Sequence, residues 1–145
     1  MPRTFTAVQS YQFVSSPKEV FRALTEPARL VKWFLSGAKV ELRTGGAFAF
    51  DWLGGYHMES TLTRFRSGRS VGFLWVDRLP SGKLARTRAE FQVTKKGRGT
   101  ILRLRHSGFR DPEHFAECSS RWAYYLTNLK SVLDHRVDLR SPHDW

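Results

Sequence analysis

The chain has 145 residues, 41% of them hydrophobic, and its 24 Lys and Arg against 13 Asp and Glu give a formal net charge of +11. This length fits one domain, which can bury roughly two thirds of the surface that the unfolded chain exposes. The single cysteine, Cys118, excludes an intrachain disulfide framework, and no apolar run is long enough to be a signal peptide or a transmembrane span. We therefore predict a cytoplasmic protein without a transmembrane segment.

The first part of the chain predicts one strand and two short helices. Apolar and polar residues alternate from Thr4 to Val14, as in a half-buried strand. Ser16 is then placed as an N-cap, with Pro17 at the first helical position and Glu19 three residues after the cap. Pro27 interrupts this helix and begins a second short helix that Gly37 ends.

The rest of the chain predicts a sheet followed by a long helix. Between Lys39 and Gly108 short alternating segments are separated by glycine turns, which indicates an antiparallel meander of six strands. From about Asp111 to Val137 apolar residues recur every three or four positions, as in an amphipathic helix of about 25 residues. A helix and a sheet that each carry one apolar face bury both faces by packing together.

An aromatic strand carries the clearest functional signal. Phe48, Phe50 and Trp52 alternate onto one face, and a two-residue turn at Gly54-Gly55 would place Trp52 opposite His57 and Phe50 opposite Glu59. Polar groups among aromatic side chains indicate either a cavity that holds a ligand or an ordinary core with one satisfied His–Glu pair. The residues alone leave both interpretations open.

The strand at 69–79 gives two conflicting signals about its facing. Counting from a two-residue turn at Ser67-Gly68 turns Gly72 and Leu74 inward, whereas side-chain bulk favours Phe73 and Trp75. A longer loop or a bulge would reconcile the two, and we predict that Phe73 and Trp75 face inward.

The positive charge gathers on two of the predicted strands. Their alternation indicates a basic surface formed by Arg86, Arg88, Arg103 and Arg105. Such a surface attracts phosphate, but the chain contains no zinc finger, ribonucleoprotein signature or helix-turn-helix pair. We therefore interpret the arginines as a solvated outer face and do not predict nucleic-acid binding.

Several segments, taken in order, resemble a known superfamily. They are residues 16–27, Trp33-Phe34, residues 43–48, residues 99–109, and the last helix with Trp122, Tyr125, Leu126 and Leu129. Their order resembles the START-like (SRPBCC) superfamily, in particular the branch named for the C-terminal domain of the activator of Hsp90 ATPase. One departure is Arg121-Trp122, where that branch often carries Gly-Trp.

The resemblance implies an α+β helix-grip fold of the START/Bet v 1-like kind. In this fold a curved antiparallel sheet of about seven strands grips a long C-terminal helix, with two short helices after the first strand. We expect a single domain over 1–138 and a tail over 139–145, for which disorder is the default expectation. The eukaryotic co-chaperone carries an additional N-terminal domain that this sequence lacks, so we do not expect full Hsp90 activation.

We predict that the chain binds, without catalysis, a small hydrophobic ligand, aromatic or lipid-like, between the sheet and the last helix. The expected contacts are the apolar residues facing this space, together with polar residues that orient the ligand: Trp33, Phe48, Phe50, Trp52, His57, Glu59, Phe73, Trp75, Phe91, Leu104, His106, Trp122, Tyr125, Leu126 and Leu129.

Three alternatives remain open. The chain could be a chaperone-linked or stress-linked interaction domain that binds a protein partner through its exterior. A cyclase-like or hydrolase-like enzyme could use His57 and Glu59 as an acid–base pair. Two histidines and a carboxylate, namely His57, His106 and Glu59, could also ligate a metal, although we predict neither a metal nor a cofactor. We expect a monomer or a homodimer.

Overall fold

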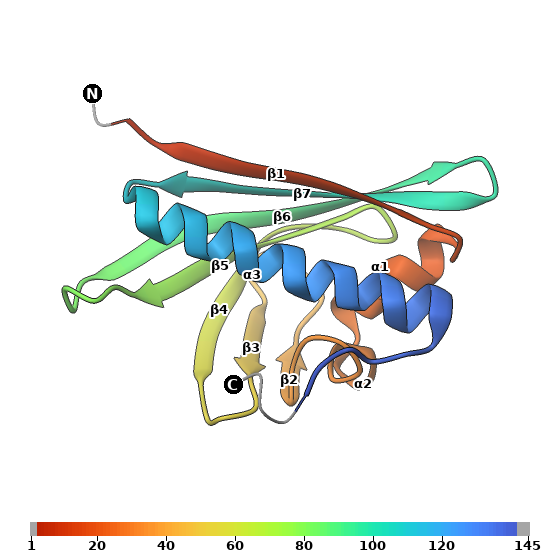
Figure 1. Ribbon diagram of the computed structural model, residues 1–145, viewed down its shortest axis with the longest axis horizontal. Helices are drawn as coiled ribbons and strands as arrows, with labels where there is room; N and C mark the ends of the chain where they lie inside the picture. The colour runs from red at the N-terminus through yellow and green to blue at the C-terminus, as the bar shows by residue number, and fades with distance from the viewer. Residues whose placement is uncertain (1–2, 142–145) are drawn as a thin grey trace.

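The computed structural model describes residues 3–141 and contains one sheet, three α-helices and a short π-helical segment within that range. The seven strands are antiparallel neighbours in the order β1-β7-β6-β5-β4-β3-β2. The long helix α3 (Pro112–Lys130) runs diagonally across one face of this sheet (Figure 1). This is the predicted helix-grip architecture.

The first strand and the first helix lie where the sequence places them, whereas the second helix ends at Leu30, well before the predicted end at Gly37, which begins the next strand instead. Strand β1 is Phe5–Phe13, followed by α1 (Pro17–Thr25) and α2 (Pro27–Leu30). The hydroxyl of Ser16 accepts a hydrogen bond from the backbone N–H of Glu19 at 3.2 Å, which confirms the predicted N-cap.

The meander contains the six predicted strands. They are β2 (Gly37–Val40), β3 (Ala47–Asp51), β4 (His57–Arg66), β5 (Ser70–Arg78), β6 (Leu84–Lys96) and β7 (Gly99–Phe109). Figure 1 shows β2 and β3 at one edge of the sheet and β1 at the other.

The register between β3 and β4 differs from the predicted register by one residue. Asp51 pairs with His57, and Phe50 pairs with Met58 rather than with Glu59. The loop holds three residues rather than the predicted two, because the N–H of Trp52 bonds to the carbonyl of Tyr56 and leaves residues 53–55 between them, with Gly54 at a φ of 91°. Since side chains alternate, this shift turns His57 and Glu59 outward and brings Met58 inward.

The facing of β5 is as predicted. Val71, Phe73 and Trp75 are buried, and the turn before them has three residues because Arg66 pairs with Ser70. A register shift also occurs in β4 between Leu62 and Arg64. The three-residue loop and the irregularity in β4 therefore allow the bulky side chains of β5 to face inward, whereas a two-residue turn would have turned them outward.

The terminal helix begins and ends with recognisable caps. The Asp111 carboxylate accepts a hydrogen bond from the N–H of Glu113, and the helix continues as a π-helical segment, Ser131–His135. Arg136 then adopts a left-handed φ of 59°, so the helix ends slightly before the predicted Val137. None of the helices within residues 3–141 is long and apolar enough to cross a membrane.

The start of the C-terminal tail is held against the body of the protein. Arg140 donates to the backbone carbonyls of Leu35 and Val31, and the N–H of Leu139 donates to the buried side chain of Asn128. The expectation of disorder is therefore wrong at Leu139 and Arg140, because Asn128 and two free carbonyls offer them partners. Trp145 lies outside the described residues.

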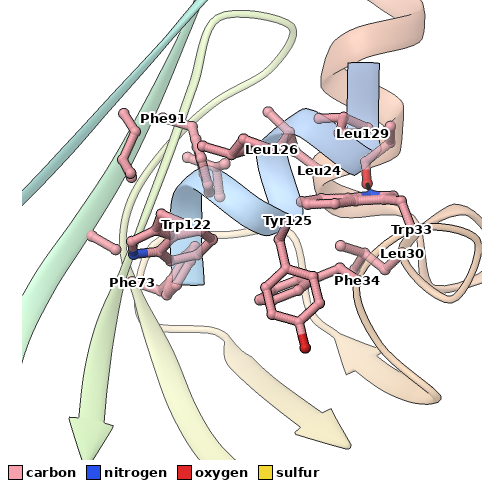
Figure 2. Close-up of a cluster of buried hydrophobic side chains, with 14 of the residues drawn as sticks. Leu24, Leu30, Trp33, Phe34, Phe73, Phe91, Trp122, Tyr125, Leu126 and Leu129 are labelled. Atoms are coloured by element: carbon pink, nitrogen blue, oxygen red, sulfur yellow. Dashed lines mark hydrogen bonds between the residues drawn. The ribbon is translucent and has the colours of Figure 1, made fainter. Parts of the chain in front are cut away.

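Aromatic side chains fill the centre of the space between sheet and helix. Phe48 and Phe50 stack with ring centroids 4.2 Å apart, and Phe50 stacks on Trp52 at 5.6 Å. Figure 2 shows how Trp33 and Phe34, which follow α2, approach the face of α3 that carries Trp122, Tyr125 and Leu129. The predicted aromatic wall therefore exists, but most of it is closed by packing.

Candidate functional site

A pocket of about 410 Å³ lies at one end of this packed interior. Its walls come from the loop between β3 and β4, the end of β5 with the turn that follows, the segment after α2, and the first half of α3. The residues that line it are Phe34, Trp52, Leu53, Gly54, Tyr56, Trp75, Asp77, Arg78, Leu79, Pro80, His114, Glu117, Cys118, Arg121, Trp122 and Tyr125.

Aromatic rings from four different parts of the chain form the apolar wall. Phe34 contacts Trp52, Trp122 and Tyr125, with centroid distances of 5.6, 5.5 and 4.9 Å. Trp75 packs against Trp122 at 5.1 Å. Figure 2 shows Tyr125 and Phe34 side by side, with the hydroxyl of Tyr125 directed away from α3. Since each ring is supported by others, this wall is formed without a ligand.

A buried carboxylate forms the polar end of the pocket. Oδ2 of Asp77 lies 2.9 Å from the indole nitrogen of Trp75, 2.7 Å from Nε2 of His114 and 3.4 Å from the sulfur of Cys118. All three of Asp77, His114 and Cys118 are buried. Asp77 follows Trp75 by two positions on β5, so it shares the inward face, and His114 and Cys118 are one helical turn apart on α3.

The surroundings of Asp77 change the acidity of two neighbours. Burial, followed by the charge of Asp77 and its hydrogen bond, raises the pKa of the Cys118 thiol far above its ordinary value. Burial and then Asp77 also raise the pKa of Tyr56, while Arg121 opposes this increase. Both groups therefore carry their protons at neutral pH, and both can donate hydrogen bonds into the pocket.

His106 lies behind the pocket wall rather than in it. Its Nδ1 accepts a hydrogen bond from the indole N–H of Trp122 at 2.9 Å, so its other nitrogen carries the proton and donates to the hydroxyl of Thr87 at 2.6 Å. Burial lowers the pKa of His106 to about 3. This neutral imidazole fixes the position of Trp122 and does not reach the pocket.

The rim of the pocket mixes exposed apolar groups with cations. Leu53 and Tyr56 are 47% and 50% exposed, and Arg78 and Arg121 stand beside them. The guanidinium of Arg121 lies 3.9 Å from Glu117, which is a weak exposed pair. The opening is therefore apolar with positive charge at its edge.

The structure brings only some of the predicted ligand contacts to the pocket. Trp52, Trp75, Trp122 and Tyr125 line it, as expected for a cavity between sheet and helix. The remaining inward residues belong to the packed core or to its polar support, outside the lining: Trp33, Phe48, Phe50, Phe73, Phe91, Leu104, His106, Leu126 and Leu129.

The prediction that His57 and Glu59 face the cavity is wrong. Both are exposed on the outer face of β4, where Nδ1 of His57 lies 2.5 Å from Asp51 and Nε2 lies 3.7 Å from Glu59. The hydrogen bond to Asp51 is the main cause that raises the pKa of His57. A role for this pair in acid–base chemistry or metal binding inside the cavity is excluded by position, and His106 lies far from it across the sheet.

The basic surface lies where the sequence predicts it. Arg86 and Arg88 on β6 and Arg103 and Arg105 on β7 are all exposed on the side of the sheet opposite α3. Within residues 3–141 none of these four guanidinium groups forms a salt bridge, whereas nearby Arg64 lies 3.9 Å from Glu90. The patch therefore presents four unpaired guanidinium groups to solvent, with the carboxylate of Glu90 opposite Arg105 on the same face.

Sequence reasoning missed the polar end of the pocket. The signals were present, because Asp77 follows Phe73 and Trp75 at inward spacing, and His114 and Cys118 stand four residues apart on the apolar stripe of the helix. An inward facing of His57 and Glu59 requires a two-residue turn that the structure does not contain. The alternation that led to Trp75 leads equally to Asp77.

Comparisons with known proteins agree with the fold. The family described as "Activator of Hsp90 ATPase homolog 1-like protein" matches residues 15–134. No curated protein sequence matches the chain.

Solved structures of similar fold come from several bacteria. A Mesorhizobium loti protein is 23% identical, with a TM-score of 0.81 over 93% of this chain and 100% of that one. The Aha1 dimer from Colwellia psychrerythraea is 23% identical, with a TM-score of 0.76 over 90% of this chain and 96% of that one. CalU16 from Micromonospora echinospora is 24% identical, with a TM-score of 0.70 over 86% of this chain and 82% of that one. At such identities these proteins share the fold.

Proposed function

Because the chain belongs to the family of activator of Hsp90 ATPase homolog 1-like proteins, we propose that its pocket binds a small, largely apolar ligand, aromatic or lipid-like, without converting it. The family match confirms the resemblance to this branch of the START-like superfamily. The observation that carries the proposal is the pocket itself, in which aromatic rings form the wall and a buried carboxylate forms one end.

The size and lining of the pocket support a small-molecule ligand. Its volume of about 410 Å³ falls within the range of about 300–1,000 Å³ that is usual for such sites. Flat rings of the ligand can stack against Trp52, Trp75 or Trp122, and the wall is already in place before binding. Little conformational cost then opposes association.

The polar groups of the pocket would orient the ligand. The hydroxyl of Tyr56 and the Asp77–His114 pair stand at one end, so a ligand with one polar end would place that end there and its apolar part along the rings. Arg78 and Arg121 at the rim would favour a neutral or anionic ligand over a cationic one.

The proposal is tested with a defined probe, 8-anilinonaphthalene-1-sulfonate, which has fused and single rings and one negative charge. We expect one binding site per chain, and the fluorescence of the probe measures how much of it is occupied. The variant Trp52→Leu should weaken binding by about tenfold or more, since it removes ring surface from the wall. The matched control is His57→Ala, which changes an exposed residue on the other face of the sheet and should leave the affinity unchanged.

Two results would contradict the proposal. One is equal binding by the native chain and Trp52→Leu, with circular dichroism confirming that both are folded. The other is native mass spectrometry and solvent extraction that recover no small molecule, together with no binding of the probe. Recovery of a molecule would identify the natural ligand class directly.

A second candidate function is supported by the basic surface defined by Arg86, Arg88, Arg103 and Arg105. Four exposed arginines without ion pairs among the described residues would complement an acidic partner protein, as expected for an interaction domain. Charge reversal of all four should abolish capture of such a partner, whereas Trp52→Leu should not. If the surface instead bound nucleic acid, gel shifts at physiological salt would reveal a complex.

The assembly state of the chain is also a proposal. The Colwellia psychrerythraea structure is described as a dimer. We propose a monomer or a homodimer for this chain, and sedimentation velocity over a range of concentrations distinguishes the two.

A further inference from the structure

Three different metal-binding side chains meet at the polar end of the pocket. The ligand atoms of Asp77, His114 and Cys118 all lie within 4.8 Å of one another, and all three residues are buried. They come from two elements, β5 and α3, that face each other across the interior. An exposed acidic cluster would carry little information, but a buried carboxylate, imidazole and thiol that converge are unusual.

We propose that Asp77, His114 and Cys118 form a zinc site at the polar end of the pocket, with a fourth position open to the pocket. Oxygen, nitrogen and sulfur donors together are typical of zinc, whereas calcium and magnesium take oxygen ligands. This inference goes beyond the proposed binding function, does not depend on it, and replaces the sequence-based expectation that no metal binds.

The two donor separations from Asp77 lie close to those around a tetrahedral ion. With usual zinc bond lengths, tetrahedral neighbours are separated by about 3.4 Å for nitrogen and oxygen and about 3.6 Å for sulfur and oxygen. The present separations from Oδ2 of Asp77 are 2.7 Å to His114 and 3.4 Å to Cys118. Opening the His114–Asp77 contact by about 0.7 Å would admit the ion.

Neighbouring groups support the ligands. The indole N–H of Trp75 donates to Asp77, which is the outer contact that orients a ligating carboxylate. His114 and Cys118 are held at fixed spacing by consecutive turns of α3, whose start is capped by Asp111. A hydrogen bond that fixes the orientation of one proposed ligand is therefore already present.

The open position gives the proposed ion access to ligands. Three protein ligands with a fourth site for water or substrate are the pattern of zinc sites that exchange ligands, in contrast to closed structural sites with four protein ligands. Here the fourth position faces a pocket lined by Tyr56 and the aromatic wall. A ligand with an anionic or carbonyl oxygen at one end would complete the coordination sphere.

Zinc binding must displace a proton from the thiol, and the proton that Nε2 of His114 donates to Asp77 must move to Nδ1 of the ring or to solvent. The thiol of Cys118, which now donates to Asp77, releases its proton to solvent as the Zn–S bond forms. The charged or titratable groups around it are Asp77 from β5, Tyr56 and Arg78 from the two loops, and His114, Glu117 and Arg121 from α3.

The test uses the purified full chain after treatment with a chelator, titrated first with Co²⁺ and then with Zn²⁺. We expect one Co²⁺ per chain with a thiolate-to-cobalt absorption band, and displacement of that band by Zn²⁺. Cys118→Ala should remove the band, and His114→Ala should weaken Zn²⁺ binding more than about tenfold in competition with a chromogenic chelator. His57→Ala is the matched control, because it removes a histidine that also contacts carboxylates but lies on the outer face.

The band in the native chain reports sulfur ligation directly, so the test does not depend on the folding of any variant. Absence of the band at millimolar Co²⁺ would overturn the proposal. So would Zn²⁺ binding that is lost in His57→Ala but retained in a folded Cys118→Ser variant, since the ion would then occupy the outer cluster. Tight binding of one Zn²⁺ with the band present would support the site even if no apolar ligand were found.

Discussion

The two histidine–carboxylate pairs of this protein have the same chemical groups in opposite surroundings. The His114–Asp77 pair is buried between β5 and α3 with a contact of 2.7 Å, while the His57–Asp51 pair is exposed on the outer face with a contact of 2.5 Å. The shorter contact belongs to the pair that water surrounds. Burial and the neighbouring groups therefore indicate how much a pair contributes to stability better than the distance between its two atoms does.

The largest expected difference concerns stability. In chelator-treated protein, Asp77→Ala leaves the buried donors of Trp75, His114 and Cys118 without their acceptor, and should lower the free energy of unfolding by about 3–5 kcal/mol. The matched variant Asp51→Ala should leave the free energy of unfolding nearly unchanged, because its partner is exposed. Urea denaturation measures both, and equal losses would remove the distinction between the pairs.

The next effect concerns His106, a buried histidine without a carboxylate partner. Its pKa of about 3 lies below the ordinary value of 6.5, so below pH 6.5 the unfolded chain binds a proton that the folded chain does not. Stability present above pH 6.5 should decline by up to about 1.4 kcal/mol per pH unit as pH falls toward 3.

Two measurements check this prediction. Urea denaturation at several pH values should give a shallower acid slope for His106→Asn than for the native chain. The ring protons of His106 should not titrate in nuclear magnetic resonance spectra between pH 5 and 8. A midpoint near 6.5 would contradict the buried, neutral imidazole that accepts from Trp122.

The smallest effect concerns His57. Its hydrogen bond to Asp51 raises its pKa above 6.5, so its contribution to stability is present at low pH and is lost as pH rises through the folded-state pKa. The ring protons of His57 should titrate with a midpoint above 6.5 in the native chain, and Asp51→Asn should move it back toward 6.5. An unchanged midpoint would mean that the exposed pair does not form in solution.

Much of the fold follows from local patterns that need no tertiary information. The N-cap at Ser16, the six-stranded meander and the long terminal helix are each specified by residues close together in the chain. The inward facing of Phe73 and Trp75 also follows from the sequence. Burying two large apolar side chains stabilises the fold by more free energy than the change from a two-residue to a three-residue loop costs.

The site was predicted only in part, for a specific reason. Trp52, Trp75, Trp122 and Tyr125 line the pocket as the apolar pattern suggests. Counting across a two-residue turn places His57 and Glu59 inward, and the third residue of the actual loop reverses every facing beyond it. Asp77, His114 and Cys118 are far apart in sequence, so only the packing of α3 on β5 shows that they meet.

Local patterns in the chain specify the architecture, because hydrophobic periodicity, caps and glycine turns act over a few residues. Which inward residues are packed away, and which border the open pocket, depends on the packing of the whole molecule. That packing also decides which histidine lies beside a buried carboxylate. Those outcomes depend on how side chains from distant segments share one volume, and no local pattern encodes that volume.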